Sequence, residues 1–139
     1  LKVEIIRPSI NKCFTEFKAI DGKIYYGLGA IKNVGYEAIS NIVKEREKNG
    51  KFTSFNNFIN RVDPKDVNKL QLEGLTKAGV FDEFYKDRNK IFTSIPKIIQ
   101  KILIRVVYSR TMKIQKIILN FYHQHLGSKK NCFLKNLIH

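Results

Sequence analysis

The alternation of apolar and polar positions predicts a β-hairpin near the N-terminus. Two runs rich in β-branched and aromatic residues, 13–20 and 23–26, flank the dipeptide Asp21-Gly22. Such a dipeptide is typical of a two-residue type I′ turn, because both central positions need a positive φ. A further short strand is predicted at residues 2–6, where the chain reaches Arg7-Pro8.

Helical spacing follows in the middle of the chain. A first helix begins after Gly35 and ends at Asn49-Gly50, a left-handed stop. Ser54 is a suitable N-cap for a second helix, which Asp63-Pro64 breaks. A third helix is expected from about residue 67 to residue 78. The side chains that these helices are expected to bury are Ala38, Ile39, Ile42, Val43, Phe55, Phe58, Ile59, Val62, Leu70, Leu75 and Ala78.

The segment before the first of these helices has the layout of a helix-hairpin-helix element. A short helix ends near Ile31, a tight turn containing Val34-Gly35 follows, and a longer amphipathic helix begins. The new helix leaves its first backbone N–H groups unpaired, and these donors, with the positive end of the helix dipole, favour a phosphate-sized anion. The candidate DNA-binding residues are Lys32, Asn33, Val34, Gly35 and Tyr36.

Each residue of the turn has an expected part in this element. Lys32 adds a positive charge beside a phosphate, Asn33 tolerates a positive φ, and Val34 packs inward. Because phosphate contacts do not depend on base sequence, the predicted binding is sequence-independent and sensitive to salt. The alternative is a packed helical hairpin whose glycines serve only the turns, with no ligand.

Charge divides the chain unevenly. The 139 residues include 26 Lys and Arg against 12 Asp and Glu, a formal net charge of +14. Residues 1–87 hold 15 basic and all 12 acidic residues, a net charge of +3, whereas residues 88–139 hold 11 basic residues and no acidic one. Most of the basic character therefore belongs to the last part of the chain, which must be interpreted separately from the rest.

Several motifs in a fixed order resemble the bacterial DNA polymerase III alpha subunit, a replicative polymerase family. Residues 24–35, IYYGLGAIKNVG, are similar to the family pattern Y-G-L-G-A-I-K-G-V-G. Residues 50–58 are similar to its G-x-F-x-S-L-x-D-F, and residues 7–13 to its P-P-D-I-N-x-S segment. The resemblance covers about residues 1 to 99. This chain departs from the family at Arg7, Ser9, Cys13, Asn33 and Thr76.

The resemblance implies a fragment that contains the end of the fingers region of such a polymerase, at residues 1–26, and the helix-hairpin-helix segment after it. This segment would hold duplex DNA behind the active site. The remainder of the replicative polymerase would then be its partner, in the bacterial cytoplasm. The parent family is a DNA-directed DNA polymerase that uses Mg²⁺ held by palm carboxylates. No catalytic residue and no cofactor are assigned to this chain, which is expected to be inactive alone. Its closest acidic pairs, expected to be surface or capping charges, are Glu45/Glu47, Asp63/Asp66 and Asp82/Glu83.

Two further groups of residues admit both a functional and a structural interpretation. Tyr25 and Tyr26 could stack on a nucleotide or simply pack in a strand. A run of basic residues near the end of the first helix is either a basic edge or a solvated helix end. Its members are Lys44, Arg46, Lys48 and Lys51. Cys13 and Cys132 lack the spacing expected of a metal site, and His123 with His125 lacks the nearby Cys, Asp or Glu ligands that such a site needs.

The basic tail begins with a helical pattern that later changes. Lys97, Lys101 and Arg105 share a face opposite an apolar stripe, but Arg110, Lys113 and Lys116 then fall in the sector of that stripe. Pro96 fits this helix only if a turn restarts there with Ser94 as its cap. One interpretation is a frameshifted or otherwise non-native reading from about residue 100. The alternative is a genuine basic helix that binds nucleic acid or an anionic membrane surface.

These observations predict a mainly α fold with a helix-hairpin-helix unit, a small N-terminal β-hairpin and a basic C-terminal tail that is helical or disordered. The expected parts are residues 1–26, 27–87 and 88–139. No membrane span is expected, because charges interrupt the most apolar stretch. The alternatives to a polymerase fragment are a free-standing basic nucleic-acid-binding protein and a degenerate gene product without function.

Overall fold

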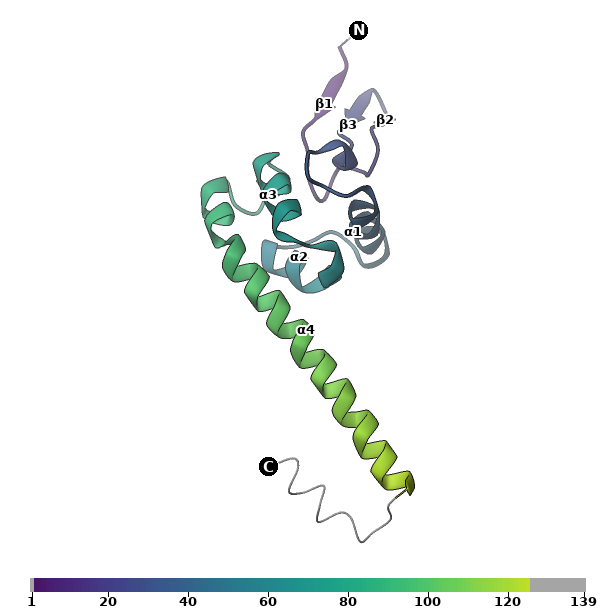
Figure 1. Cartoon of the computed structure of the whole chain (residues 1–139). Helices are drawn as coiled ribbons and strands as arrows, with labels where there is room; N and C mark the ends of the chain where they lie inside the picture. Colours follow the sequence, from purple (N-terminus) through teal and green to yellow (C-terminus); the bar gives the residue numbers. More distant parts are fainter. Residues whose placement is uncertain (1, 126–139) are drawn as a thin grey trace. The chain divides into compact units, whose positions relative to one another are not determined.

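The computed structural model describes residues 2–125, and the predicted end of the basic tail, 126–139, lies outside these residues. The described part is mostly helical, with a small sheet near the N-terminus, as predicted (Figure 1). Its contacts divide the chain into two compact units after Gln100. The elements are, in chain order, β1 (Glu4–Ile6), β2 (Lys18–Ile20), β3 (Lys23–Tyr25), the 3₁₀ turn η1 (Leu28–Ala30), α1 (Tyr36–Asn49), α2 (Phe55–Arg61), the 3₁₀ turn η2 (Pro64–Asp66), α3 (Lys69–Lys77) and α4 (Arg88–His125).

The predicted hairpin is confirmed and belongs to a three-stranded sheet with the order β1-β3-β2. Strands β2 and β3 are antiparallel, and the turn between them has φ of 50° at Asp21 and 75° at Gly22. These two positive values are those a type I′ turn needs. Strand β1 pairs in parallel with β3, with Glu4 opposite Lys23. No local pattern in the sequence specifies this parallel pair, because its two strands are joined by a long connection.

The core of the first unit is built around phenylalanines from three different segments. The ring centroids of Phe52 and Phe58 lie 5.2 Å apart, and those of Phe58 and Phe81 lie 5.1 Å apart. Phe55 contacts Phe81 edge-on at 5.0 Å. Such edge-to-face pairs add stability beyond the area that they bury. They join α2 to the residues that follow α3, where Gly79, at φ 82°, turns the chain back.

The first two helices of the middle segment are confirmed. Helix α1 buries Ala38, Ile39 and Ile42, and it ends at Gly50 with a φ of 87°. Helix α2 begins at Ser54, whose Oγ accepts a hydrogen bond from the Asn57 N–H at 3.0 Å. These ends lie where the capping residues predicted them.

Helix α3 differs from its prediction in the side chain that it buries. Leu70 was expected inside, but it is 58% exposed, whereas Leu72 is fully buried. The helix starts at Lys69, after Asn68, whose Oδ1 accepts a hydrogen bond from the Gln71 N–H at 2.8 Å. Residues that are two positions apart in an α-helix are separated by about 200° around its axis. Leu70 and Leu72 therefore lie on nearly opposite faces, and only the latter reaches the core.

Arg46 does not belong to a solvated basic edge. It is only 6% exposed, and its Nη1 donates hydrogen bonds to the backbone oxygens of Ile10 and Cys13 at 2.8 and 2.6 Å. Its guanidinium carbon also lies 5.3 Å from the centre of the Phe14 ring. A single buried cation therefore satisfies the carbonyl groups of the loop between β1 and β2. Its position at the last turn of α1 agrees with the favourable place of a cation in a helix dipole.

Helix α4 is continuous through Pro96, so the expected restart at that residue is wrong. Ser94 is not a cap, because its Oγ donates to the Lys90 backbone oxygen at 2.7 Å, one turn earlier in the same helix. Proline lacks the N–H that an inner helical position donates, so one backbone bond is lost at this point. The basic tail is helical as far as residue 125. None of the helices described in residues 2–125 has both the length and the apolar character needed to cross a membrane.

Candidate nucleic-acid interface

The turn between η1 and α1 is closed by a hydrogen bond from the Val34 N–H to the Ile31 backbone oxygen at 3.2 Å. Asn33 occupies its third position with φ of 68°. A positive φ at this position alone is the pattern of a type II turn, in which glycine or asparagine is favoured. The left-handed conformation expected of Asn33 is thus present.

Helix α1 starts directly after this turn with Gly35 as its N-cap, and no side chain of the described residues caps it. The first backbone bond into the helix runs from the Ile39 N–H to the Gly35 oxygen at 3.1 Å. The N–H groups of residues 36–38 therefore stand at the positive end of the helix without helical partners. Glu37 is the acidic residue of this first turn, and it is exposed.

Helix α3 packs directly against the turn, and Gly74 makes the close approach possible. A Cβ atom on Gly74 would lie 2.6 Å from the Lys32 backbone oxygen and 3.3 Å from Val34 Cγ2. Real side chains do not tolerate the first distance, so only glycine fits without a shift of the turn. Val34 itself is half-buried. The shape of the turn is therefore fixed by a helix that lies about 40 residues later in the sequence.

Gln71, one turn earlier on α3, lies beneath the start of α1. It is 9% exposed, and its Oε1 is buried without a hydrogen-bond partner among the described residues. Its Nε2 lies 3.3 Å from the point where a Cβ on Gly35 would stand. The amide of Gln71 thus packs against the N-cap of α1 from the side of the core.

Tyr36, the first residue of α1, points to the β-rich region. Its hydroxyl donates a hydrogen bond to Glu16 Oε1 at 2.9 Å. This hydrogen bond to a carboxylate raises the pKa of the Tyr36 phenol. The ring also lies beside Gly29, where a Cβ would come within 3.2 Å of Tyr36 Cδ2. Tyr36 therefore ties the start of α1 to the segment before the hairpin.

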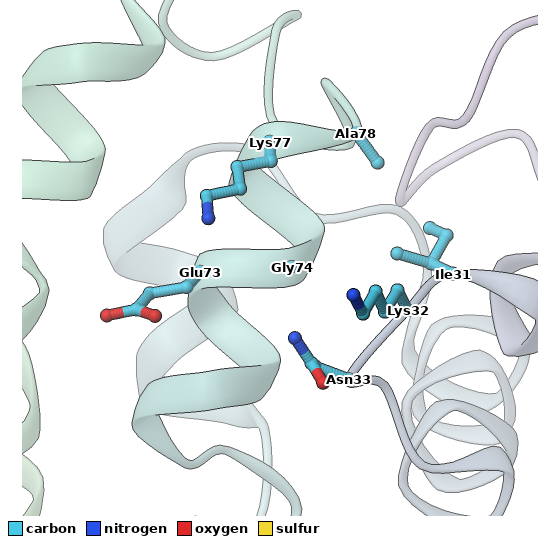
Figure 2. Close-up of a pocket in the computed structure, with 7 residues that line it drawn as sticks. All are labelled: Ile31, Lys32, Asn33, Glu73, Gly74, Lys77 and Ala78. Carbon is cyan, nitrogen blue, oxygen red and sulfur yellow. The ribbon is translucent and has the colours of Figure 1, made fainter.

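An open pocket of about 330 Å³ lies between the turn and α3 (Figure 2). Lys32 and Asn33 line it from the turn, and Lys77 lines it from the last turn of α3. Glu73 also borders the pocket, but its carboxylate points away from the turn in Figure 2 and pairs with Lys69 at 4.0 Å. Lys32 and Asn33 therefore face α3 across the pocket, whereas the Lys77 ammonium group points away from the turn in Figure 2 and lies 5.3 Å from the centre of the Phe92 ring.

The predicted site residues do not all meet in one place. Lys32 and Asn33 share the pocket, whereas Val34 packs against α3, Gly35 caps α1 and Tyr36 bonds to Glu16. Sequence reasoning missed Lys77, Gln71 and Gly74. A signal for Gly74 was available, since glycine inside a helix costs about 1 kcal/mol relative to alanine and so indicates close packing. Lys77 had no such signal.

The two tyrosines before the turn have aromatic packing partners. The Tyr25 ring meets Phe14 edge-on with centroids 5.8 Å apart, and the Tyr26 ring lies 4.8 Å from Phe17. Both tyrosines are half-buried. These contacts account for the two side chains by packing alone.

The acidic side chains near helix ends have local partners, and Asp66 is not the surface charge that was expected. It is 6% exposed, and its Oδ1 accepts a hydrogen bond from the Asn41 Nδ2 at 3.2 Å. Glu45 pairs with Arg61 at 3.2 Å, and hydrogen bonds from Asn49 and then from Arg61 lower the pKa of Glu45. Asp82 pairs with Arg88 at 2.7 Å, which raises the pKa of Arg88, and Asp63 Oδ1 accepts from the Lys65 N–H at 3.0 Å. Among residues 2–125 no group of three His, Cys, Asp or Glu side chains could hold a metal ion.

Comparisons with known proteins place this geometry in context. A family model described as a helix-hairpin-helix motif matches residues 2–91. The chain is similar to DNA polymerase III subunit alpha of Borreliella burgdorferi, with 43% identity over 98 residues, and of Campylobacter jejuni, with 43% over 99 residues. The same protein of Thermus aquaticus is 37% identical over 100 residues. These matches cover 70%, 68% and 72% of this chain but only 8% of each relative.

Proposed function

The chain belongs to the helix-hairpin-helix family, and from this premise we propose that its turn and the start of α1 bind the phosphate backbone of duplex DNA. The observation that carries the proposal is the uncapped N-terminus of α1, whose N-cap Gly35 follows Lys32 by three residues. Free N–H groups at a helix start, together with a nearby ammonium group, are suited to a phosphate. Such contacts carry no base information, so the binding is sequence-independent.

Lys77 brings a second positive charge near the proposed site, although its ammonium group points away from the turn. The carboxylate that also lines this pocket, that of Glu73, is paired with Lys69. The Lys77 Nζ lies 5.3 Å from the centre of the Phe92 ring, a contact that leaves its positive charge in place. Glu37 opposes phosphate binding, since it adds a negative charge to the first turn of α1.

The similarity to DNA polymerase III alpha subunits supports a place in DNA replication. We propose that the chain acts as a part of a replicative DNA polymerase III alpha subunit, with the rest of that polymerase as its partner in the bacterial cytoplasm. It contributes DNA binding and not the polymerase chemistry, for which the described residues offer no group of metal-binding carboxylates. A free-standing nucleic-acid-binding protein is the alternative, and it would show the same binding without the partner.

The test uses residues 1–100, the compact unit that lacks most of the basic tail, and compares two charge reversals. Lys32→Glu lies at the turn, and Lys48→Glu lies at the other end of α1. Both change the net charge equally. We expect the first to weaken binding to a short duplex by about tenfold and to reduce the slope of log affinity against log salt by about one. The second should have much less effect.

Equal losses in the two variants would show binding by bulk charge and would contradict the proposal. Unrelated duplex sequences serve as a further control, because each variant should lose the same factor on every sequence. Glu37→Gln tests the same site in the opposite direction. Removing its negative charge should raise affinity by a few-fold at low salt, since a charge in the first helical turn contributes about 0.3–1 kcal/mol.

A further inference from the structure

Nine large apolar side chains of the segment 101–125 of α4 are exposed, and they lie on several sides of the helix. Five of them form a stripe within a sector of about 60° when successive residues are placed 100° apart around the helix. All five are exposed to between 42% and 62%. They are Leu103, Val107, Ile114, Ile118 and Phe121. Side chains of this kind are normally buried, so the stripe marks a surface that something covers.

The opposite side of the same segment is basic. Lys101, Arg105, Lys113 and Lys116 fall in a sector centred about 170° from the centre of the apolar stripe. No acidic residue occurs anywhere after residue 87. Arg110 alone lies at the border of the apolar sector, where a long side chain can extend its charged end past apolar neighbours. After residue 107 the apolar stripe therefore moves to another side of the helix, and the separation of apolar from basic residues continues there.

We propose that residues 101–125 form an amphipathic helix that binds the surface of an anionic phospholipid membrane. A helix with Lys and Arg on one face and Phe, Leu and Ile on the other lies in the plane of the interface, with its apolar face among the acyl chains. Anionic headgroups complement the basic side, and each nearby Lys or Arg adds to the attraction. The proposed binding depends on the amino-acid sequence of residues 101–125 and not on the reading frame that encodes them.

Charge complementarity and the apolar stripe together favour this occupant over two others. Duplex DNA would neutralise the basic side but would leave the stripe in water, because a phosphate backbone offers no apolar surface. A second copy would cover the stripe, but it would bring together two chains that each carry +14. A membrane with anionic lipids covers the apolar side and neutralises the basic side at once.

The experiment measures co-sedimentation of the full chain with vesicles of phosphatidylcholine alone and of phosphatidylcholine mixed with phosphatidylglycerol. The test variant is Ile114→Ser with Ile118→Ser, on the stripe. The control is Met112→Ser with Leu119→Ser, which removes two apolar side chains from the basic side of the same segment. Because the test residues are 57% and 42% exposed, their replacement does not threaten a core. Circular dichroism checks that both variants keep the helix.

We expect binding to the anionic vesicles only, reduced at least about tenfold by the test variant and less than about threefold by the control. No loss in either variant would overturn the proposal, since it would indicate adsorption of a polycation. An equal loss in the two variants would overturn it too, since it would indicate apolar binding without a preferred face of the helix. Absence of binding to anionic vesicles would overturn it as well. Sedimentation equilibrium tests the rival occupant: a dimer that the test variant dissociates would assign the stripe to a second copy and overturn the proposal.

Discussion

The first hundred residues and the segment 101–125 differ in how they treat apolar side chains. In the first unit Leu28, Ile39, Phe58 and Leu72 are fully buried. In residues 101–125 large apolar side chains such as Ile104 and Ile117 are more than 60% exposed. The first unit therefore has a core of its own, whereas the apolar surface of the segment is available to a partner.

Basic residues accordingly have different roles in these two regions of the chain. In the first unit a basic residue matters through its position, as for buried Arg46 or for Lys32 beside a helix start. In the segment 101–125 basic residues matter as a face opposite an apolar stripe. The net charge of +14 on its own identifies neither arrangement. Identical substitutions placed in the two regions should therefore have different consequences, and three matched pairs test this.

The largest difference is expected between Arg46→Met and Arg110→Met. Loss of the Arg46 guanidinium leaves the Ile10 and Cys13 carbonyl groups without their buried donor, and each orphaned group costs about 1–3 kcal/mol. We expect the free energy of unfolding in urea to fall by about 3 kcal/mol. Arg110 is exposed, so its replacement should change stability by less than about 0.5 kcal/mol. Similar values for the two variants would remove the distinction between the regions.

The second pair, Gly74→Ala and Ser109→Ala, places the same methyl group in two helices. At Gly74 it would lie 2.6 Å from the Lys32 backbone oxygen, so the turn or α3 must move. Overpacking of this kind costs about 1–3 kcal/mol, against a gain of about 1 kcal/mol from replacing glycine in a helix. Urea unfolding should show a net loss of stability, and duplex binding should weaken because the turn shifts. Ser109→Ala, at an exposed position, should leave both unchanged.

Elements specified by nearby residues could be predicted from the sequence. The hairpin at Asp21-Gly22, the capped start of α2 at Ser54 and the glycine stop of α1 each depend on a few adjacent positions. The parallel pairing of β1 with β3 depends on segments that are far apart, so no local pattern indicated it. Burial of Arg46 escaped prediction for the same reason, because its acceptors lie more than 30 residues earlier.

The candidate site was predicted in part for related reasons. The turn sequence indicated the left-handed Asn33 and the uncapped start of α1, since both are properties of consecutive residues. The contribution of α3 depends on tertiary packing, so Lys77 and Gln71 could not be assigned to the site beforehand. In the segment 101–125 the change of pattern suggested a loss of amphipathicity. The exposed fractions show apolar side chains on several sides of this segment instead, five of them in one stripe.

The smallest of the three differences is expected between Asn33→Ala and Asn120→Ala. Asn33 holds φ at 68°, where an ordinary side chain costs about 1–2 kcal/mol and asparagine less. Alanine there should lower the free energy of unfolding by roughly 1 kcal/mol, and Asn33→Gly should restore or exceed the original value. Asn120 lies inside α4 and is exposed, so alanine should favour that helix slightly. A destabilising Asn33→Gly would mean that the asparagine side chain, and not its conformation, supports the turn.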